Sequence, residues 1–121
     1  MKYMLLIYNR PGFLEELTDT EREALFGEVG EIMAELEQSG ELVGGQALAD
    51  PSTARTSRGV GGRAVLTDGP FQESKEQFAG YVELDCETRE RAEEIALRWP
   101  DTRFGGAIEV RAVMQDSGAE M

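Results

Sequence analysis

An unbroken apolar run opens the chain, with no alternation of hydrophobic and polar positions from Tyr3 to Tyr8. The run is too short for a buried helix, and the turn-forming sequence Asn-Arg-Pro-Gly follows it at 9–12, so it predicts a β-strand. Because both faces of this strand are apolar, both faces of its sheet need a cover. Helices can cover one face, and the other face requires a second layer.

Two segments carry the apolar period of an amphipathic helix. The first begins with a capping-box pattern, Thr18 with Glu21 or Thr20 with Glu23, and Gly40 is placed to cap its end, which predicts a helix over about 18–39. The second predicted helix covers 88–99 and ends before Pro100. Each has one apolar stripe, formed by Leu25, Val29, Ile32, Met33 and Leu36 in the first and by Ala92, Ile95, Ala96 and Trp99 in the second.

Three further segments, 41–48, 77–85 and 107–114, predict strands. The first contains Gly44 and Gly45, which predict a bulge or the close approach of another chain segment. Residues 53–58 and 63–67 flank the glycine-rich stretch 59–62 and predict a polar hairpin. The resulting order predicts an α+β fold of the ferredoxin-like βαββαβ type with an inserted β-hairpin. Two helices leave one sheet face bare, so we expect a second copy to cover it in a two-fold dimer.

The length of 121 residues corresponds to about one domain. We assign residues 1–115 to this domain and 116–121 to a flexible, polar C-terminal tail. The N-terminal apolar stretch is shorter than the core of a signal peptide, and no stretch approaches the roughly 18 apolar residues of a membrane span. These features predict a cytoplasmic protein.

Charge and missing residue types exclude several classes of function. Lys and Arg number 12 against 24 Asp and Glu, so the net charge of −12 argues against general nucleic-acid binding and against anionic membrane surfaces. The chain has no His, which excludes His-based catalysis and His metal ligands. Cys86 is the only cysteine and is expected to be a packed thiol. No metal and no cofactor are predicted.

One short segment, 67–77, concentrates polar and charged groups. Its Asp-Gly-Pro sequence predicts a turn, and Phe71 is expected to anchor that turn in the core. Glu73, Lys75 and Glu76 follow within a few residues. The segment is either a polar loop capped by Asp68 or the charged wall of a pocket at the edge of the sheet.

The individual residues leave the same alternatives. Asp68 is the candidate catalytic residue, either a general base if it is buried or a cap of its own turn. Lys75 either binds an anionic ligand or pairs with Glu73 or Glu76. Tyr81 either points into a barrel together with Tyr3 or packs in the core. The ligand-binding candidates are Asp68, Glu73, Lys75, Glu76 and Tyr81.

Several stretches carry a resemblance to a known family. They are the string Asp68-Gly69-Pro70-Phe71, then Glu73, Lys75-Glu76 and Gly80-Tyr81, and the stretches 1–8, 40–45 and 106–114. Together they resemble the YCII-related family, DGPF subgroup, over about residues 1–115. The resemblance implies a dimeric α+β barrel, whose wider superfamily includes small-molecule isomerases, monooxygenases and dehydrochlorinases. It also implies a sigma factor as a partner, because many DGPF members are encoded beside one. The His-Asp pair of some YCII-like proteins has no counterpart in this chain.

These observations favour a homodimeric module that binds a small molecule or regulates a partner. The alternative is a cofactor-independent enzyme that performs isomerase-like or lyase-like proton transfer on a small organic acid or aromatic in the barrel. A dimeric scaffold is the third interpretation. The sequence leaves open whether the chain is an enzyme.

Overall fold

The doubly apolar segment at the start of the chain forms β1 (Lys2–Asn9) and lies inside the sheet of a computed structural model that describes residues 1–114. Its neighbours are β5 (Gln77–Asp85) and β6 (Ala107–Ala112), and β2 (Leu42–Ala47) pairs with the outer edge of β5. All pairs are antiparallel, in the order β2-β5-β1-β6. The predicted ferredoxin-like α+β class is therefore confirmed. The predicted tail at 116–121 lies outside the described residues.

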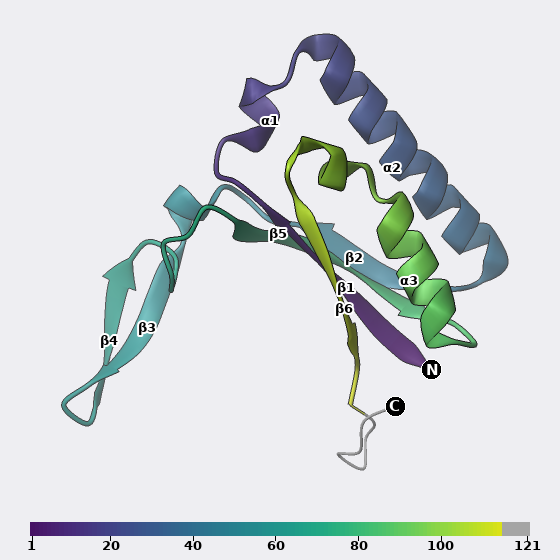
Figure 1. Cartoon of the computed structure of the whole chain (residues 1–121). Coiled ribbons are helices and arrows are strands. Elements are labelled where there is room, and N and C mark those ends of the chain that lie inside the picture. Colours follow the sequence, from purple (N-terminus) through teal and green to yellow (C-terminus); the bar gives the residue numbers. More distant parts are fainter. Residues whose placement is uncertain (115–121) are drawn as a thin grey trace.

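The helices lie on one side of this sheet (Figure 1). They are α1 (Phe13–Glu16), α2 (Asp19–Ser39) and α3 (Arg89–Arg98). Two 3₁₀ turns occur in the connections, η1 (Pro51–Thr53) between β2 and β3 and η2 (Pro100–Phe104) between α3 and β6. The predicted capping box is present, because the Thr18 hydroxyl accepts from the Glu21 amide at 3.1 Å and the Glu21 carboxylate accepts from the Thr18 amide at 2.8 Å. Gly40 ends α2 with a left-handed φ of 80°. None of the described helices is long and apolar enough to cross a membrane.

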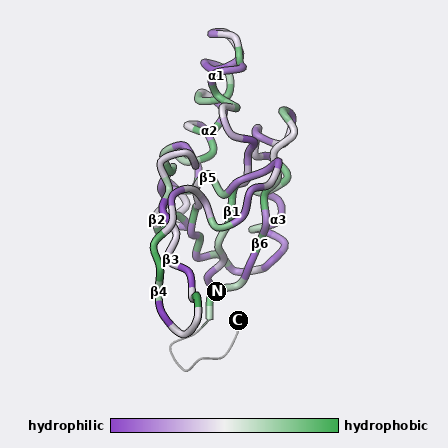
Figure 2. The backbone as a smooth tube through the Cα atoms, turned by 90° about the vertical axis from the view of Figure 1, so that its left-hand side faces the viewer, coloured by the Kyte–Doolittle hydropathy of each residue, from purple (hydrophilic) through white to green (hydrophobic). Residues whose placement is uncertain are grey.

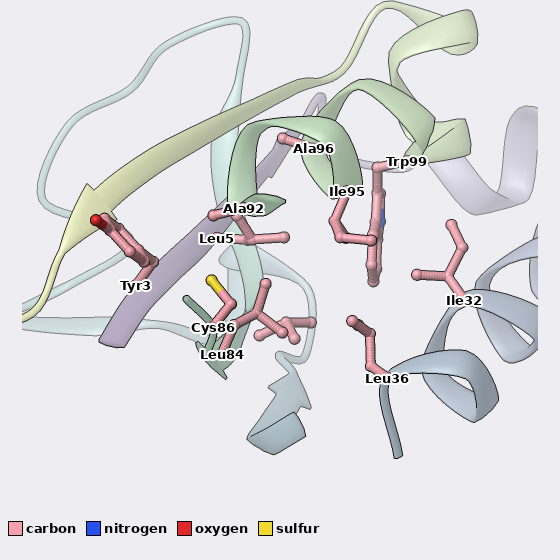
Figure 3. Close-up of a cluster of buried hydrophobic side chains, with 11 residues drawn as sticks. Tyr3, Leu5, Ile32, Leu36, Leu84, Cys86, Ala92, Ile95, Ala96 and Trp99 are labelled. Carbon is pink, nitrogen blue, oxygen red and sulfur yellow. The ribbon is translucent and has the colours of Figure 1, made fainter. Parts of the chain in front are cut away.

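The main core fills the layer between the sheet and the two longer helices (Figure 3). Leu5 of β1, Leu84 of β5 and Ile95 of α3 are fully buried there. Trp99 and Cys86 are each 4% exposed, which confirms their predicted core positions. The other buried members are Tyr3, Ile32, Leu36, Val82, Ala92 and Ala96.

The opposite face of the sheet has no cover among the described residues. Met4, Leu6 and Tyr8 of β1 alternate with the core positions and are only partly buried. Tyr81 pairs with Leu6 across the strands, whereas Tyr3 pairs with Leu84, so the two tyrosines lie on opposite faces. Tyr81 lies three residues before Leu84, the partner of Tyr3, and side chains alternate between the two faces along a strand. The expectation that Tyr3 and Tyr81 point into one barrel is therefore wrong.

Gly45 and Gly80 allow β2 and β5 to approach closely. A Cβ atom on Gly45 would lie 2.7 Å from the Tyr81 carbonyl oxygen, and one on Gly80 would lie 2.7 Å from the Gln46 carbonyl oxygen. The register also shifts between Leu42 and Gly44. Both the close approach and the irregularity predicted from the glycine pair are therefore present.

The inserted hairpin extends away from the main sheet (Figure 1). It consists of β3 (Arg55–Val60) and β4 (Arg63–Asp68), which pair only with each other. Gly61 and Gly62, with φ of 57° and 80°, form a two-residue turn that is tighter than the predicted loop 59–62. Hydrophilic and hydrophobic residues both occur along the hairpin (Figure 2).

An ion-pair cluster fixes α3 against α2. Arg91 contacts Glu35 at 3.0 Å and Glu41 at 2.9 Å, and Arg98 contacts Glu35 at 2.8 Å. Hydrogen bonds from Arg98 and Arg91 lower the pKa of Glu35 to about 2. The cluster therefore holds the two helices in register above the sheet.

Candidate functional site

A cavity of about 510 Å³ lies between α1, α2 and the adjoining ends of β1, β2 and β5. Its volume falls within the range of small-molecule pockets, roughly 300–1,000 Å³. Val29 and Met33 of the predicted apolar stripe border it, which explains why they are only partly buried while Ile32 and Leu36 are buried. Most lining side chains are apolar, among them Ile7, Phe13, Leu25, Phe26, Leu48 and Trp99.

The short helix α1 closes one side of the cavity. Gly12, with a left-handed φ of 75°, turns the chain from β1 into α1. Phe13 and Leu17 are buried against Leu25 of α2, and Phe104 packs on this second cluster. The sequence interpretation missed α1, although the four-residue spacing of Phe13 and Leu17 is a helical signal.

Asp101 is the most deeply buried charged group of the described chain and lines this cavity. It is 7% exposed and is the second residue of η2, directly after Pro100. The side-chain amide of Asn9, at the end of β1, donates to Asp101 Oδ2 at 2.7 Å. Burial raises the pKa of Asp101, and the Asn9 hydrogen bond opposes that rise. The carbonyl oxygen Oδ1 of Asn9 is buried with no partner among the described residues.

Three further charged groups border the same cavity. Glu15 and Asp50 add two carboxyl groups, and hydrogen bonds from the Ser52 side chain and amide lower the pKa of Asp50. Arg10 is the basic group among the described lining residues, and its guanidinium contacts Glu16 at 2.7 Å and donates to the Phe104 carbonyl at 2.6 Å. The cavity is therefore apolar inside and acidic at its polar points.

Asp101→Asn is expected to stabilise the chain at pH 7. A carboxyl whose pKa is raised by folding binds its proton more tightly in the folded state, so the free energy of unfolding falls as pH rises from the ordinary pKa through the raised one. Asparagine keeps the acceptor for Asn9 without this loss. Urea unfolding of both proteins should give equal midpoints near pH 3 and a higher midpoint for Asp101→Asn at pH 7. A lower midpoint for the variant at pH 7 contradicts the assigned direction.

Most of the ligand-binding candidates chosen from the sequence lie outside the cavity. Tyr81 is among the residues that line the cavity. It is only partly buried, whereas its strand neighbours Gly80 and Val82 are buried. Asp68, Lys75 and Glu76 are all exposed, and none of them lines this cavity. The same holds for Glu73. A ligand role for these four residues stays a prediction.

The turn that contains Asp68 lies at the base of the projecting hairpin. The Asp68 carboxylate is 93% exposed and pairs with Arg55 Nε at 3.2 Å across the hairpin, so it lacks the burial expected of a general base. Phe71 is 64% exposed, and the guanidinium carbon of Arg58 lies 5.1 Å from the centroid of its ring. The expectation that Phe71 anchors the turn in the core is wrong, because the hairpin carries this turn away from the sheet. Lys75 forms no ion pair with any described residue, so the predicted pairing with Glu73 or Glu76 is absent.

Sequence reasoning missed Asp101 and Asn9 because their burial depends on contacts between distant segments. Asp101 follows a helix-ending Pro100, a position that is often exposed. Only the return of η2 onto the end of β1 brings Asp101 and Asn9 together, 92 residues apart in sequence. No group of three or more metal-ligating side chains lies within residues 1–114.

Two comparisons with known proteins bear on this chain. The family described as the YCII-related domain matches residues 1–116. An uncharacterized protein from Rhizobium meliloti (strain 1021) is 28% identical over 96 residues, which cover 79% of this chain and 77% of that protein. The family match shows which family the chain belongs to, and neither match names a ligand or a site residue.

Proposed function

The chain belongs to the YCII-related family, and we propose that it is a homodimeric module that binds a small, mainly apolar organic molecule in the cavity beneath α1 and α2. The cavity is the observation that carries this proposal. It combines apolar side chains with a few polar groups at fixed positions, which is the composition of small-molecule sites.

We also infer that the chain belongs to the DGPF subgroup of this family. The string Asp68-Gly69-Pro70-Phe71 and its acidic and basic followers support that placement. In the single chain this segment is exposed and adjoins the projecting hairpin, so it is accessible to a protein partner. A sigma factor remains the partner that the family resemblance predicts.

The dimer is supported by the uncovered sheet face. Met4, Leu6 and Tyr8 lie there, and Phe78 packs edge-on against Tyr8 with ring centroids 5.8 Å apart. The cross-strand partners Glu83, Glu109 and Arg111 add charged groups to this face, so its apolar residues form a strip along β1. An exposed apolar strip on a sheet is commonly closed by a second layer. We propose that the same face of a second copy supplies it.

Ligand binding is tested by thermal shift with 3-phenylpropan-1-ol, a neutral probe that fits an apolar cavity. Binding to the folded state raises the melting temperature by mass action. The variant Val29→Trp fills the cavity from α2 and is expected to abolish the shift, whereas Ala34→Trp places the same side chain on the exposed face of α2 and is expected to preserve it. Circular dichroism confirms that each variant is folded. An equal shift in Val29→Trp contradicts the proposed site, and so does the absence of a shift in the natural chain with this probe and with its charged analogues at millimolar concentration.

A further inference from the structure

Among the charged groups that border the cavity, hydrogen-bond acceptors outnumber donors. Carboxyl groups of Glu15, Asp50 and Asp101 border it. The guanidinium of Arg10 is committed to Glu16 and to the Phe104 carbonyl, and it stacks on Phe13 with its carbon 5.8 Å from the ring centroid. A ligand that enters the cavity therefore meets acceptors that need a donor.

Asp101 is the acceptor best placed to bind such a donor. The Asn9 amide donates to Oδ2, and the backbone amide of Asp101 also bonds to this carboxyl group. No other residue of the described chain is recorded as a donor to Oδ1, so this oxygen can accept from a ligand. Glu15 and Asp50 are exposed at the rim, where water and salt screen their charge. Asp101 is buried, where an interaction with an opposite charge is stronger than at the surface.

The net charge of the chain also favours a ligand that carries positive charge. At −12 it disfavours the approach of anions and favours the approach of cations. A buried carboxylate among apolar side chains is stabilised when a cation and its hydrogen bonds replace the water that it has lost. The ligand chemistry that matches these conditions is a protonated amine on an apolar body.

We propose, on the basis of the small-molecule function proposed above, that the cavity selects an organic amine whose ammonium group donates to Asp101 Oδ1. The apolar body of the amine lies against Val29, Met33 and Trp99. This ligand class is opposite in charge to the anion that Lys75 was predicted to attract. Lys75 lies outside the cavity, so it does not determine what enters.

The test compares three probes of similar size: 3-phenylpropylamine, 3-phenylpropan-1-ol and 3-phenylpropanoate. Isothermal titration at pH 7 is expected to give the amine a dissociation constant at least tenfold lower than that of the alcohol, and the carboxylate the highest value. Asp101→Asn keeps the acceptor for Asn9 and removes the charge. This variant is expected to reduce amine affinity about tenfold, to the level of the alcohol, while alcohol affinity stays within twofold.

Glu90→Gln is the matched control, because it removes one exposed acidic charge from the start of α3, away from the cavity lining. It is expected to leave all three affinities within twofold. If the alcohol binds but the amine binds no better, or if Asp101→Asn leaves the amine preference intact, the amine inference is overturned while the cavity function stands. If none of the three probes binds at millimolar concentration, the proposed function fails, and the amine inference fails with it.

Discussion

Replacing Leu6 with lysine is expected to convert a dimer into a folded monomer, whereas the same replacement at Leu5 is expected to unfold the chain. The two residues are neighbours on β1 and point to opposite faces of the sheet. Leu5 has no exposed surface and belongs to the main core. Leu6 is partly exposed on the face that we propose to be covered by a second copy.

The expected magnitudes differ for a physical reason. At Leu5 the change removes a fully buried side chain, worth roughly 2–5 kcal/mol by analogy with truncation to alanine, and it also buries an unpaired ammonium group. Together these effects are comparable to the roughly 5–15 kcal/mol that stabilise a typical domain. At Leu6 the ammonium group reaches water once the two copies separate, so the monomer keeps its core.

Sedimentation velocity and circular dichroism at micromolar concentration distinguish the two variants. The natural chain is expected to sediment as a dimer, Leu6→Lys as a folded monomer, and Leu5→Lys without native circular dichroism. A natural chain that sediments as a folded monomer at this concentration refutes the proposed dimer. Loss of structure in Leu6→Lys and Leu5→Lys alike would show instead that both faces of β1 belong to one core.

The main elements could be predicted because each depends on signals close together in the sequence. The capping box at Thr18 and Glu21 and the left-handed Gly40 determine both ends of α2 locally. The predicted strands 77–85 and 107–114 correspond to β5 and β6, with β6 ending at Ala112. Two short elements, the single helical turn α1 and the 3₁₀ turn η2, were absent from the prediction.

The candidate site could not be predicted in the same way, because it depends on which distant segments meet. Phe71 is apolar and its turn sequence is distinctive, yet the hairpin places it outside the core. Asp101 is charged and its local sequence is ordinary, yet it is buried between η2 and the end of β1. Residue type alone therefore gives the wrong exposure for both residues, and the tertiary contacts decide which of them meets the cavity.

Trp99→Ala is expected to lower the free energy of unfolding by about 3–5 kcal/mol, the usual range for truncating a large buried aromatic. Trp99 is 4% exposed, packs in the main core and also borders the cavity. Its removal joins a new void to an existing one, so the surrounding side chains have few atoms with which to fill the space. The loss should therefore lie in the upper part of that range.

Leu97→Ala is the control for this change, because Leu97 lies two residues earlier on α3 and is 84% exposed. It is expected to alter the free energy of unfolding by no more than about 0.5 kcal/mol. Trp99 is the single tryptophan of the chain, so urea unfolding of the natural protein and of Leu97→Ala can be followed by fluorescence, and that of Trp99→Ala by circular dichroism. A loss below about 1 kcal/mol in Trp99→Ala would mean that the helix end adjusts to fill the void. In that case the wall between core and cavity is not rigid, and the preference of the cavity for a particular ligand shape would have to come from α1 and α2 alone.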